Sequence, residues 1–204
     1  MKSYSNIRQI MVKIILLFFI IISVFSPGEV KAAGVYNSIS LPIKQQAPKK
    51  KWCWACCGAA CVKYTRGISI SKEDFAEQVK GNTTNDLTAT MNEVRNGLSD
   101  FLVHGAIGSG AMSFNSIMLN IDDLERPVIV GWKYYDSSLN CVGGHMVTIM
   151  GYGVITGTNT VNKVNYMDPA YNTYQWATYS SFCSKHISLS NVDRIWAEFI
   201  NQIY

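Results

Sequence analysis

Three side chains in this sequence could together supply a nucleophile, a base and the group that orients the base. Cys53 follows an irregular, proline-containing segment and begins a stretch that we expect to be helical, and the positive end of a helix favours a thiolate. His145 follows two glycines and begins an expected strand, whereas Asp168 ends the next one. If these strands pair antiparallel, His145 and Asp168 become neighbours, the geometry in which an acid holds an imidazole tautomer.

The first 32 residues are expected to be a secretory signal peptide. Residues 1–13 carry positive charge, residues 14–25 form an apolar run, and a Ser-Pro-Gly sequence ends that run. The run is shorter than the ~20 residues that a membrane-spanning helix needs. We predict cleavage after Ala32 or Ala33, which makes the mature chain a secreted, extracellular protein. An uncleaved signal anchor is the alternative.

The composition of the rest of the chain, residues 33–204, indicates one globular domain. The chain has 204 residues, of which 48% are hydrophobic and 16% charged, so it can bury a core. Its formal net charge is +4, but residues 1–32 hold four basic residues and one acidic residue, which leaves only +1 on the domain. A nearly neutral domain lacks the basic face of a nucleic-acid-binding protein. We expect a monomer that binds neither nucleic acid nor, after signal cleavage, a membrane.

The six cysteines are not spaced like a disulfide framework. An even number in an exported protein suggests disulfides, yet four of the six lie between Cys53 and Cys61, and the others are Cys141 and Cys183. Taken alone, Cys53 is best explained as a buried or disulfide-bonded residue. The order of cysteine, Gly-Gly-His and Asp-Pro along one chain reverses that preference.

Three other functions use some of the same residues. Cys53 and Cys56 form a Trp-Cys-x-x-Cys sequence that suits thiol–disulfide exchange. Thioredoxin-like proteins place this sequence after a buried strand, and no strand is expected before it here. A zinc site could use Cys53, Cys56 or Cys57 together with His145, but the second ligand pair of common zinc modules is missing. A non-catalytic, disulfide-stabilised binding module predicts that Cys53 is oxidised.

The hydrophobic pattern predicts an α+β fold in which helices dominate the first half and strands the second. Residues 34–51 look irregular. Helices are expected at residues 52–64, from Ser71 with a capping box to Asp74, at residues 86–101, after Ser113, and in a C-terminal tail with Trp196 and Phe199. Strands are expected at residues 127–132, 145–152, 161–167 and 173–177. This segregation indicates two lobes and not alternating βαβ units.

Several short motifs together resemble papain-like cysteine peptidases. They are Gln46, Trp52-Cys53-Trp54-Ala55, Pro127-Val-Ile-Val, Gly144-His145-x-Val-x-Ile-x-Gly-Tyr152 and Asp168-Pro169. The resemblance covers about residues 40–200 and follows the papain order of Gln, Cys, His and Asp. It is closest to the small bacterial branch with a Cys-Trp-Ala nucleophile motif, which includes type III effector peptidases of plant pathogens and relatives of the bacteriocin-leader peptidases.

The resemblance implies a catalytic role for each of these residues. Cys53 would be the nucleophile, His145 the general base and acid, and Asp168 the group that orients His145. A glutamine side chain and the Cys53 backbone N–H would donate to the oxyanion of the tetrahedral intermediate. The resemblance also implies a papain-like fold of two lobes, with the central helix starting at the nucleophile and an antiparallel sheet in the C-terminal half. The expected activity is that of an endopeptidase acting on peptides or proteins through a thioester, without metal or organic cofactor.

Two positions depart from the family pattern. The family glutamine lies six residues before the cysteine, where this chain has Ala47. Gln46 lies seven residues before Cys53 and is the favoured candidate, and Gln45 is the other. The second departure is Cys56, where the family usually has alanine.

Overall fold

The structure of the chain is a computed structural model that describes residues 33–157 and 159–204. The expected signal peptide lies outside the described residues. Within these ranges, no helix combines the length and the apolar character of a membrane-spanning segment. From Gly34 to Tyr204 the chain forms one unit in which helices dominate the first half and an antiparallel sheet the second, as the sequence predicts.

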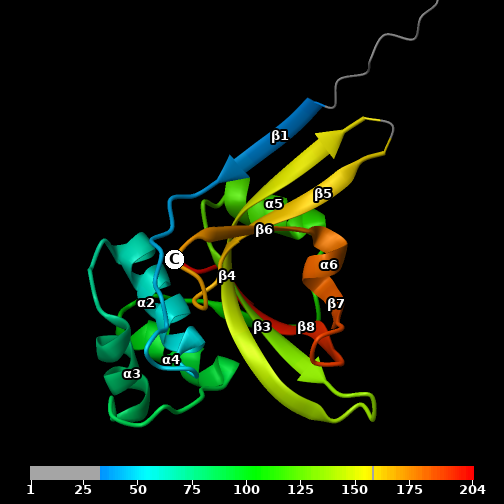
Figure 1. Ribbon diagram of the computed structural model, residues 1–204. Helices are drawn as coiled ribbons and strands as arrows, with labels where there is room; N and C mark the ends of the chain where they lie inside the picture. Colours follow the sequence, from blue (N-terminus) through cyan, green and yellow to red (C-terminus); the bar gives the residue numbers. More distant parts are fainter. Residues whose placement is uncertain (1–32, 158) are drawn as a thin grey trace, which may run out of the picture. The chain divides into compact units, whose positions relative to one another are not determined.

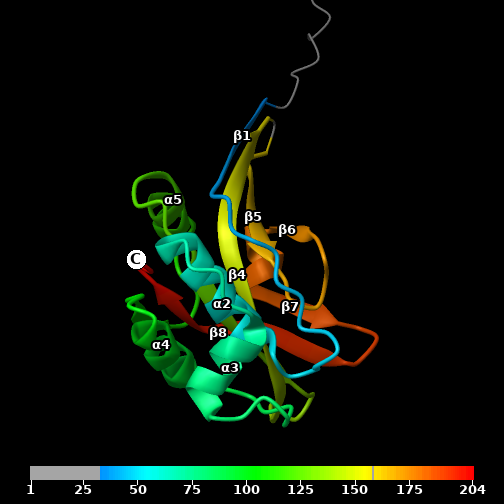
Figure 2. The same cartoon turned by 90° about the vertical axis from the view of Figure 1, so that its left-hand side faces the viewer.

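Three of the helices lie on one side of one long strand, and much of the sheet lies on the other. The helices are α2 (Cys53–Arg66), α3 (Lys72–Lys80), α4 (Met91–Asp100), α5 (Phe114–Asp122) and α6 (Tyr179–Cys183). The strands are β1 (Ala33–Ser38), β2 (Ala106–Ser109), β3 (Val128–Tyr135), β4 (Cys141–Thr156), β5 (Val161–Met167), β6 (Tyr174–Thr178), β7 (Ser184–Ile187) and β8 (Val192–Asn201). Figure 1 shows α2, α3 and α4 on one side of β4 and α6 on the other. In Figure 2, β5, β6 and β7 lie on the side of β4 away from α4.

The sheet has the strand order β2-β8-β3-β4-β5-β6, with β1 paired to β4 and β7 paired to β8. Its ladders β2–β8, β3–β8, β3–β4, β4–β5, β5–β6 and β7–β8 are all antiparallel. β4 therefore lies between β3 and β5 in the middle of the sheet, and its continuous buried stretch from Met146 to Gly153 faces neighbours on both sides. A central position of this kind holds a strand rigidly, since both of its edges are hydrogen-bonded.

The helix α2 is buried around its whole circumference over ten consecutive residues, from Cys53 to Val62. It packs against α3, α4 and β4. The small side chains of its Cys-Cys-Gly-Ala-Ala-Cys stretch allow this close approach from every side. Gly67 ends the helix in the left-handed conformation, with φ of 69°, and its N–H donates to the Lys63 carbonyl, which is the helix end that glycine favours.

Local capping signals set the start of α3 and α4. Ser71 and Asp74 form the capping box predicted for α3, and Thr90 and Glu93 form a second one for α4. The predicted start of α4 near residue 86 is therefore wrong, because Thr90 caps the helix one residue before Met91. The preceding Leu87 is exposed, and its carbonyl accepts a hydrogen bond from the Trp54 indole at 3.0 Å.

The predicted helical tail is also wrong, because Trp196 and Phe199 lie in strand β8. Their spacing fits a helix, but the segment pairs with β3 on one edge and with β2 and β7 on the other. These non-local hydrogen bonds outweigh the local pattern. Three short strands, β1, β2 and β7, also lie where no strand was predicted.

An aromatic side chain fills the space above a glycine where α2 and α3 meet. A Cβ at Gly58 would lie 2.2 Å from the Phe75 ring. That ring cannot move away freely, because it stacks on Phe101 at 5.9 Å between centroids and lies 6.2 Å from the Trp54 ring.

We expect Gly58→Ala to lower the free energy of unfolding by about 1–3 kcal/mol, the usual cost of overpacking a core. Urea denaturation of the reduced protein measures this change. Combining the substitution with Phe75→Leu, which shortens the opposing side chain, should cost less than the sum of the two single changes. Unchanged stability of the Gly58→Ala protein would contradict this account of the helix contact.

Candidate active site

The thiol of Cys53 lies where α2 meets the sheet. Cys53 is the first residue of α2, and the backbone N–H of Met146 in β4 donates to its Sγ at 3.4 Å. The side chain of Trp52, the residue before the helix, forms no capping hydrogen bond. The first N–H groups of a helix are therefore left without a side-chain cap beside the thiol, and such groups favour a negative charge.

His145 and Asp168 form a short hydrogen bond, with 2.6 Å between Nε2 and Oδ1. The pairing that brings them together is the antiparallel β4–β5 ladder, in which Thr148 lies opposite Met167. Asp168 is 6% exposed and also accepts from the Ala170 N–H at 2.9 Å. The carboxylate is thus buried with two donors, and it fixes one nitrogen of the imidazole ring.

The structure corrects the predicted position of His145 within its strand. β4 begins at Cys141, so His145 lies inside the strand and not at its start. Gly143 and Gly144 are strand residues that pair with Tyr134 and Lys133. Gly144 allows close packing of β4 on β3, since a Cβ there would lie 3.1 Å from the Trp132 carbonyl oxygen.

Burial of the His145 ring disfavours its charged form, but the hydrogen bonds to the Asp168 carboxylate and to the Cys53 thiol outweigh burial and raise the pKa of His145 to about 9. Because Nε2 faces Asp168, Nδ1 is the nitrogen left for the sulfur. The imidazole thus lies between a thiol and a carboxylate and is hydrogen-bonded to both, an arrangement that can hold an imidazolium at neutral pH.

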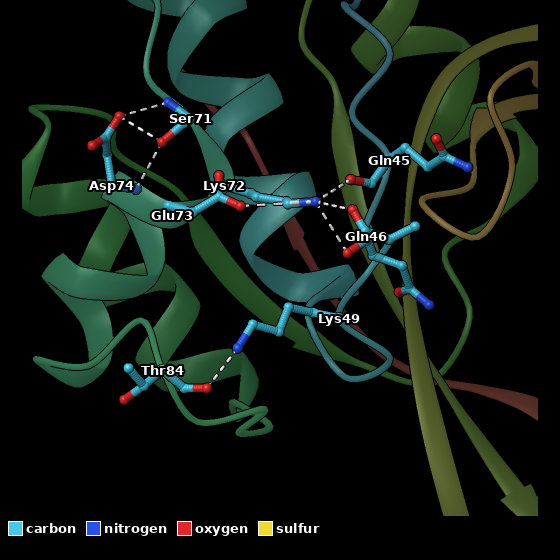
Figure 3. A network of polar contacts seen from close by, with 9 residues as sticks. Gln45, Gln46, Lys49, Ser71, Lys72, Glu73, Asp74 and Thr84 are labelled. Carbon is cyan, nitrogen blue, oxygen red and sulfur yellow. Dashed lines mark hydrogen bonds and ion pairs between the residues drawn. The ribbon is translucent and has the colours of Figure 1, made fainter.

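The two candidate glutamines differ in their surroundings. Gln45 is exposed, whereas Gln46 is half-buried, and Figure 3 shows their side chains leaving the loop in different directions. The Gln46 Nε2 donates to the Lys50 carbonyl at 3.3 Å, and its N–H donates to the Pro169 carbonyl at 2.9 Å. Gln46 is therefore tied both to the segment just before Cys53 and to the segment just after Asp168.

A lysine that sequence reasoning missed holds this loop. Lys72 reaches from α3 and donates to the carbonyls of Gln45 at 2.9 Å, Gln46 at 3.1 Å and Ala47 (Figure 3). Its three N–H donors are thus matched by three successive carbonyls. A cation at the start of a helix opposes the helix dipole, so the loop contact, and not helix stability, accounts for a lysine here. The only sequence signal was a lysine directly after a cap, which is not specific.

The surroundings of the other cysteines disfavour a redox role. All six cysteines are free. Burial raises the pKa of Cys56 to about 12 and also raises those of Cys57 and Cys61, which disfavours the thiolate that exchange requires. Residues 39–52, directly before α2, contain no strand. Among the described residues there is no group of three His, Cys, Asp or Glu side chains that could hold a metal ion.

A cleft of about 570 Å³ opens beside Cys53 and His145. Its walls come from the segment before α2, the start of α4, and strands β3, β4 and β8. Gly131, Trp132 and Met146 form part of the sheet side, and Met91 lies on the helix side. The cleft places a bound molecule against the thiol, between the helices and the sheet.

The fold and the site together define the class of papain-like cysteine peptidases. The Peptidase_C39 like family matches residues 38–203, so the chain belongs to this family and is a cysteine peptidase. The fold is similar to that of a solved structure of UfSP from C. elegans, with a TM-score of 0.51 and 12% sequence identity. That alignment covers 86% of this chain and 35% of the other, so this chain spans about a third of that protein. Among curated proteins, none matches the sequence.

We expect Asp168→Asn to lower the pKa of His145 from about 9 toward the ordinary value of 6.5. The substitution keeps the side-chain shape but removes the negative charge that favours the imidazolium. An NMR titration of the His145 ring protons measures this, and the imidazolium should lose its proton at a lower pH in the variant. The His104 and His186 signals are internal controls. An unchanged His145 titration would show that Asp168 does not set the charge of the ring.

We expect Lys72→Met to release the Gln45–Ala47 loop, because three carbonyls lose their shared donor. Hydrogen exchange of the Gln46 amide should become about 10-fold faster or more, since its bond to Pro169 is no longer held in place. Lys72→Arg keeps a cation and several donors and serves as the matched variant. Its Gln46 amide should exchange faster than in the unmodified protein and more slowly than in Lys72→Met. Exchange in Lys72→Met as slow as in the unmodified protein would contradict the proposed restraint.

Proposed function

We propose that this protein is a secreted endopeptidase that cleaves peptide bonds with Cys53, His145 and Asp168. The observation that carries the proposal is the 2.6 Å bond from His145 Nε2 to Asp168 Oδ1, made by a ring whose hydrogen bond to the Cys53 thiol helps to raise its pKa. A nucleophile, a base and an orienting group in contact are what covalent hydrolysis of an amide requires.

The proposed cycle begins with a Cys53 thiolate beside a His145 imidazolium. The sulfur attacks the peptide carbonyl, and the imidazolium gives its proton to the leaving amine as the tetrahedral intermediate collapses to a thioester. The neutral imidazole then takes a proton from water, and the resulting hydroxide attacks the thioester. The second collapse breaks the carbon–sulfur bond, releases the acid and leaves the Cys53 thiolate beside the His145 imidazolium, the starting pair. No step needs a metal or an organic cofactor.

The oxyanion of each tetrahedral intermediate needs hydrogen-bond donors. The Cys53 backbone N–H lies at the uncapped start of α2, and Gln46 Nε2 has a second hydrogen beyond the one given to Lys50. We assign these two groups to the oxyanion hole, with Gln46 preferred to the exposed Gln45. The Lys72 contacts keep the Gln46 backbone in place, and a fixed donor stabilises a transition state better than a mobile one.

The remaining parts of the proposal rest on the sequence. The charged and apolar layout of residues 1–32 supports secretion by a cleaved signal peptide. The near-neutral charge of the rest disfavours nucleic acid as a partner, and we propose a monomer that acts on peptides or proteins. The Trp-Cys-Trp-Ala motif supports membership of the small bacterial branch of the papain-like peptidases.

Alkylation with limiting iodoacetamide at pH 6 tests the assignment. An ordinary thiol of pKa ~8.5 is almost all protonated at this pH and reacts slowly, so rapid labelling of Cys53 indicates a thiolate held by His145. We expect His145→Ala to slow that labelling about 100-fold and Cys56→Ala to leave it unchanged. The exposed Cys141 shows in the same sample how an accessible thiol behaves. Peptide mapping by mass spectrometry gives the rates.

The opposite pattern supports a different chemistry. If Cys53 is labelled only after reduction and His145→Ala has no effect, the peptidase proposal fails. A dependence on Cys56 in that case would indicate thiol–disulfide exchange, and its absence would indicate a structural disulfide.

A further inference from the structure

We propose that the cleft selects a substrate with a positively charged side chain close to the scissile bond, and that Glu198 binds this side chain. The inference rests on the proposed function, since it treats the cleft as the peptide-binding site. It adds the chemical class of the substrate and the residue that recognises it.

Glu198 lies in a row of residues that crosses the sheet from the thiol. Gly131 in β3 pairs with Met146 in β4 on one side and with Glu198 in β8 on the other. Residues directly opposite each other in antiparallel strands point to the same face, so all three face the cleft that they line. Neighbouring strands are ~4.8 Å apart, which places Glu198 about 10 Å along the sheet from Met146.

The start of this row is fixed to the reacting sulfur. The Met146 N–H donates to Cys53 Sγ at 3.4 Å, so a peptide carbonyl at the sulfur lies near one end of the row and Glu198 lies at the other. A span of about 10 Å suits a backbone bound at the thiol and one long side chain reaching along the sheet. Lysine and arginine are the side chains with both this length and a cationic end.

Two side chains occupy the space over Gly131, the middle residue of the row, because the glycine has no side chain of its own. A Cβ there would lie 2.9 Å from Met91 Cε and 3.0 Å from Glu198 Cγ. The absence of a Cβ therefore lets the Met91 thioether and the stem of Glu198 both lie over the glycine. Met91 gives this part of the cleft apolar surface, against which the methylene stem of a basic side chain packs well.

Glu198 has no competing partner. It is the one carboxylate among the residues that line the cleft, and its carboxylate makes no ion pair or hydrogen bond within the described ranges. Lys50, Lys51 and Lys133 also line the cleft. Lys50 and Lys51 are exposed to water, which weakens their attraction for an acidic substrate. Glu198, like Lys133, is half-buried, and its strand β8 is paired on both edges, where a fixed charge interacts more strongly.

Peptides that end in an acyloxymethyl ketone test the preference directly, because they alkylate an active-site thiol without turnover. The set is N-terminally blocked and carries arginine, its neutral isostere citrulline, leucine or glutamate at either of the two residues nearest the ketone. The measurement is the second-order rate of Cys53 labelling by mass spectrometry. We expect arginine to exceed citrulline by about 10-fold at one of the two positions, the size of effect that a partly buried ion pair gives.

Variants assign the preference to Glu198. Glu198→Gln should reduce the arginine-to-citrulline ratio to within about 2-fold while leaving the rate with leucine nearly unchanged, and Glu198→Arg should favour the glutamate peptide. Lys133→Gln is the matched control, because it removes a charge from the same cleft and should preserve the arginine preference.

The failures are distinguishable. If the ketones label Cys53 with no difference between arginine and citrulline, or if glutamate is favoured in the unmodified protein, this inference is wrong and the peptidase proposal stands. The inference is equally wrong if Glu198→Gln leaves the arginine preference intact. If no peptide labels Cys53 although iodoacetamide does, the cleft is not a peptide site and the proposed function fails as well.

Discussion

The packing of the start of α2 against β4 is the contact on which the rest of the site depends. Cys53 belongs to the helix and His145 to the strand, so the two meet only if these elements approach closely. The Met146 N–H, which reaches Cys53 Sγ at 3.4 Å, marks that approach. The helix can approach the strand this closely because many of the side chains that α2 directs toward its neighbours are small. The crowding of Cys56, Cys57 and Cys61 in this helix then has a packing explanation, since each behaves as a small apolar residue.

The thiols of α2 belong to the same residue type but differ in their surroundings. Cys56 lies one turn beyond Cys53 and is completely buried, which raises its pKa to about 12. Cys53 lies at the helix start, with a backbone N–H and an imidazole as neighbours. The same contrast explains why a buried histidine holds its charge. Burial alone would make His145 neutral, but Asp168 and Cys53 each offer a hydrogen bond that favours the imidazolium.

Elements with a strong local signal could be predicted from the sequence, and those fixed by distant pairing could not. The Ser71 capping box marks the start of α3, and the strand predicted for Val161–Met167 is β5 to the residue. The tail with Trp196 and Phe199 has apolar spacing that fits a helix, yet β3 offers an unpaired edge that makes it a strand. No local pattern reports whether such an edge is available.

The same distinction holds inside the site. That His145 and Asp168 lie side by side follows from two motifs and one assumption, the antiparallel pairing that β4 and β5 adopt. Lys72 and Glu198 had no comparable signal. The contacts of Lys72 depend on how α3 lies against a distant loop, and the place of Glu198 depends on its register opposite Gly131. Neither relation exists until the chain has folded.

Strand β3 shows how chemistry and recognition can share an element without interfering. Successive residues of a strand point to opposite faces, so Gly131 leaves room for the side chains of Met91 and Glu198 while Trp132 supports the histidine. The Trp132 ring lies 6.2 Å from the His145 ring, and its indole N–H donates to the Phe182 carbonyl at 3.1 Å. Because this support lies behind the imidazole, a change in the side chains over Gly131 alters what the cleft accepts and leaves the contacts of His145 in place. The backbone that fixes the reacting groups therefore also fixes the distance from the thiol at which Glu198 meets a substrate.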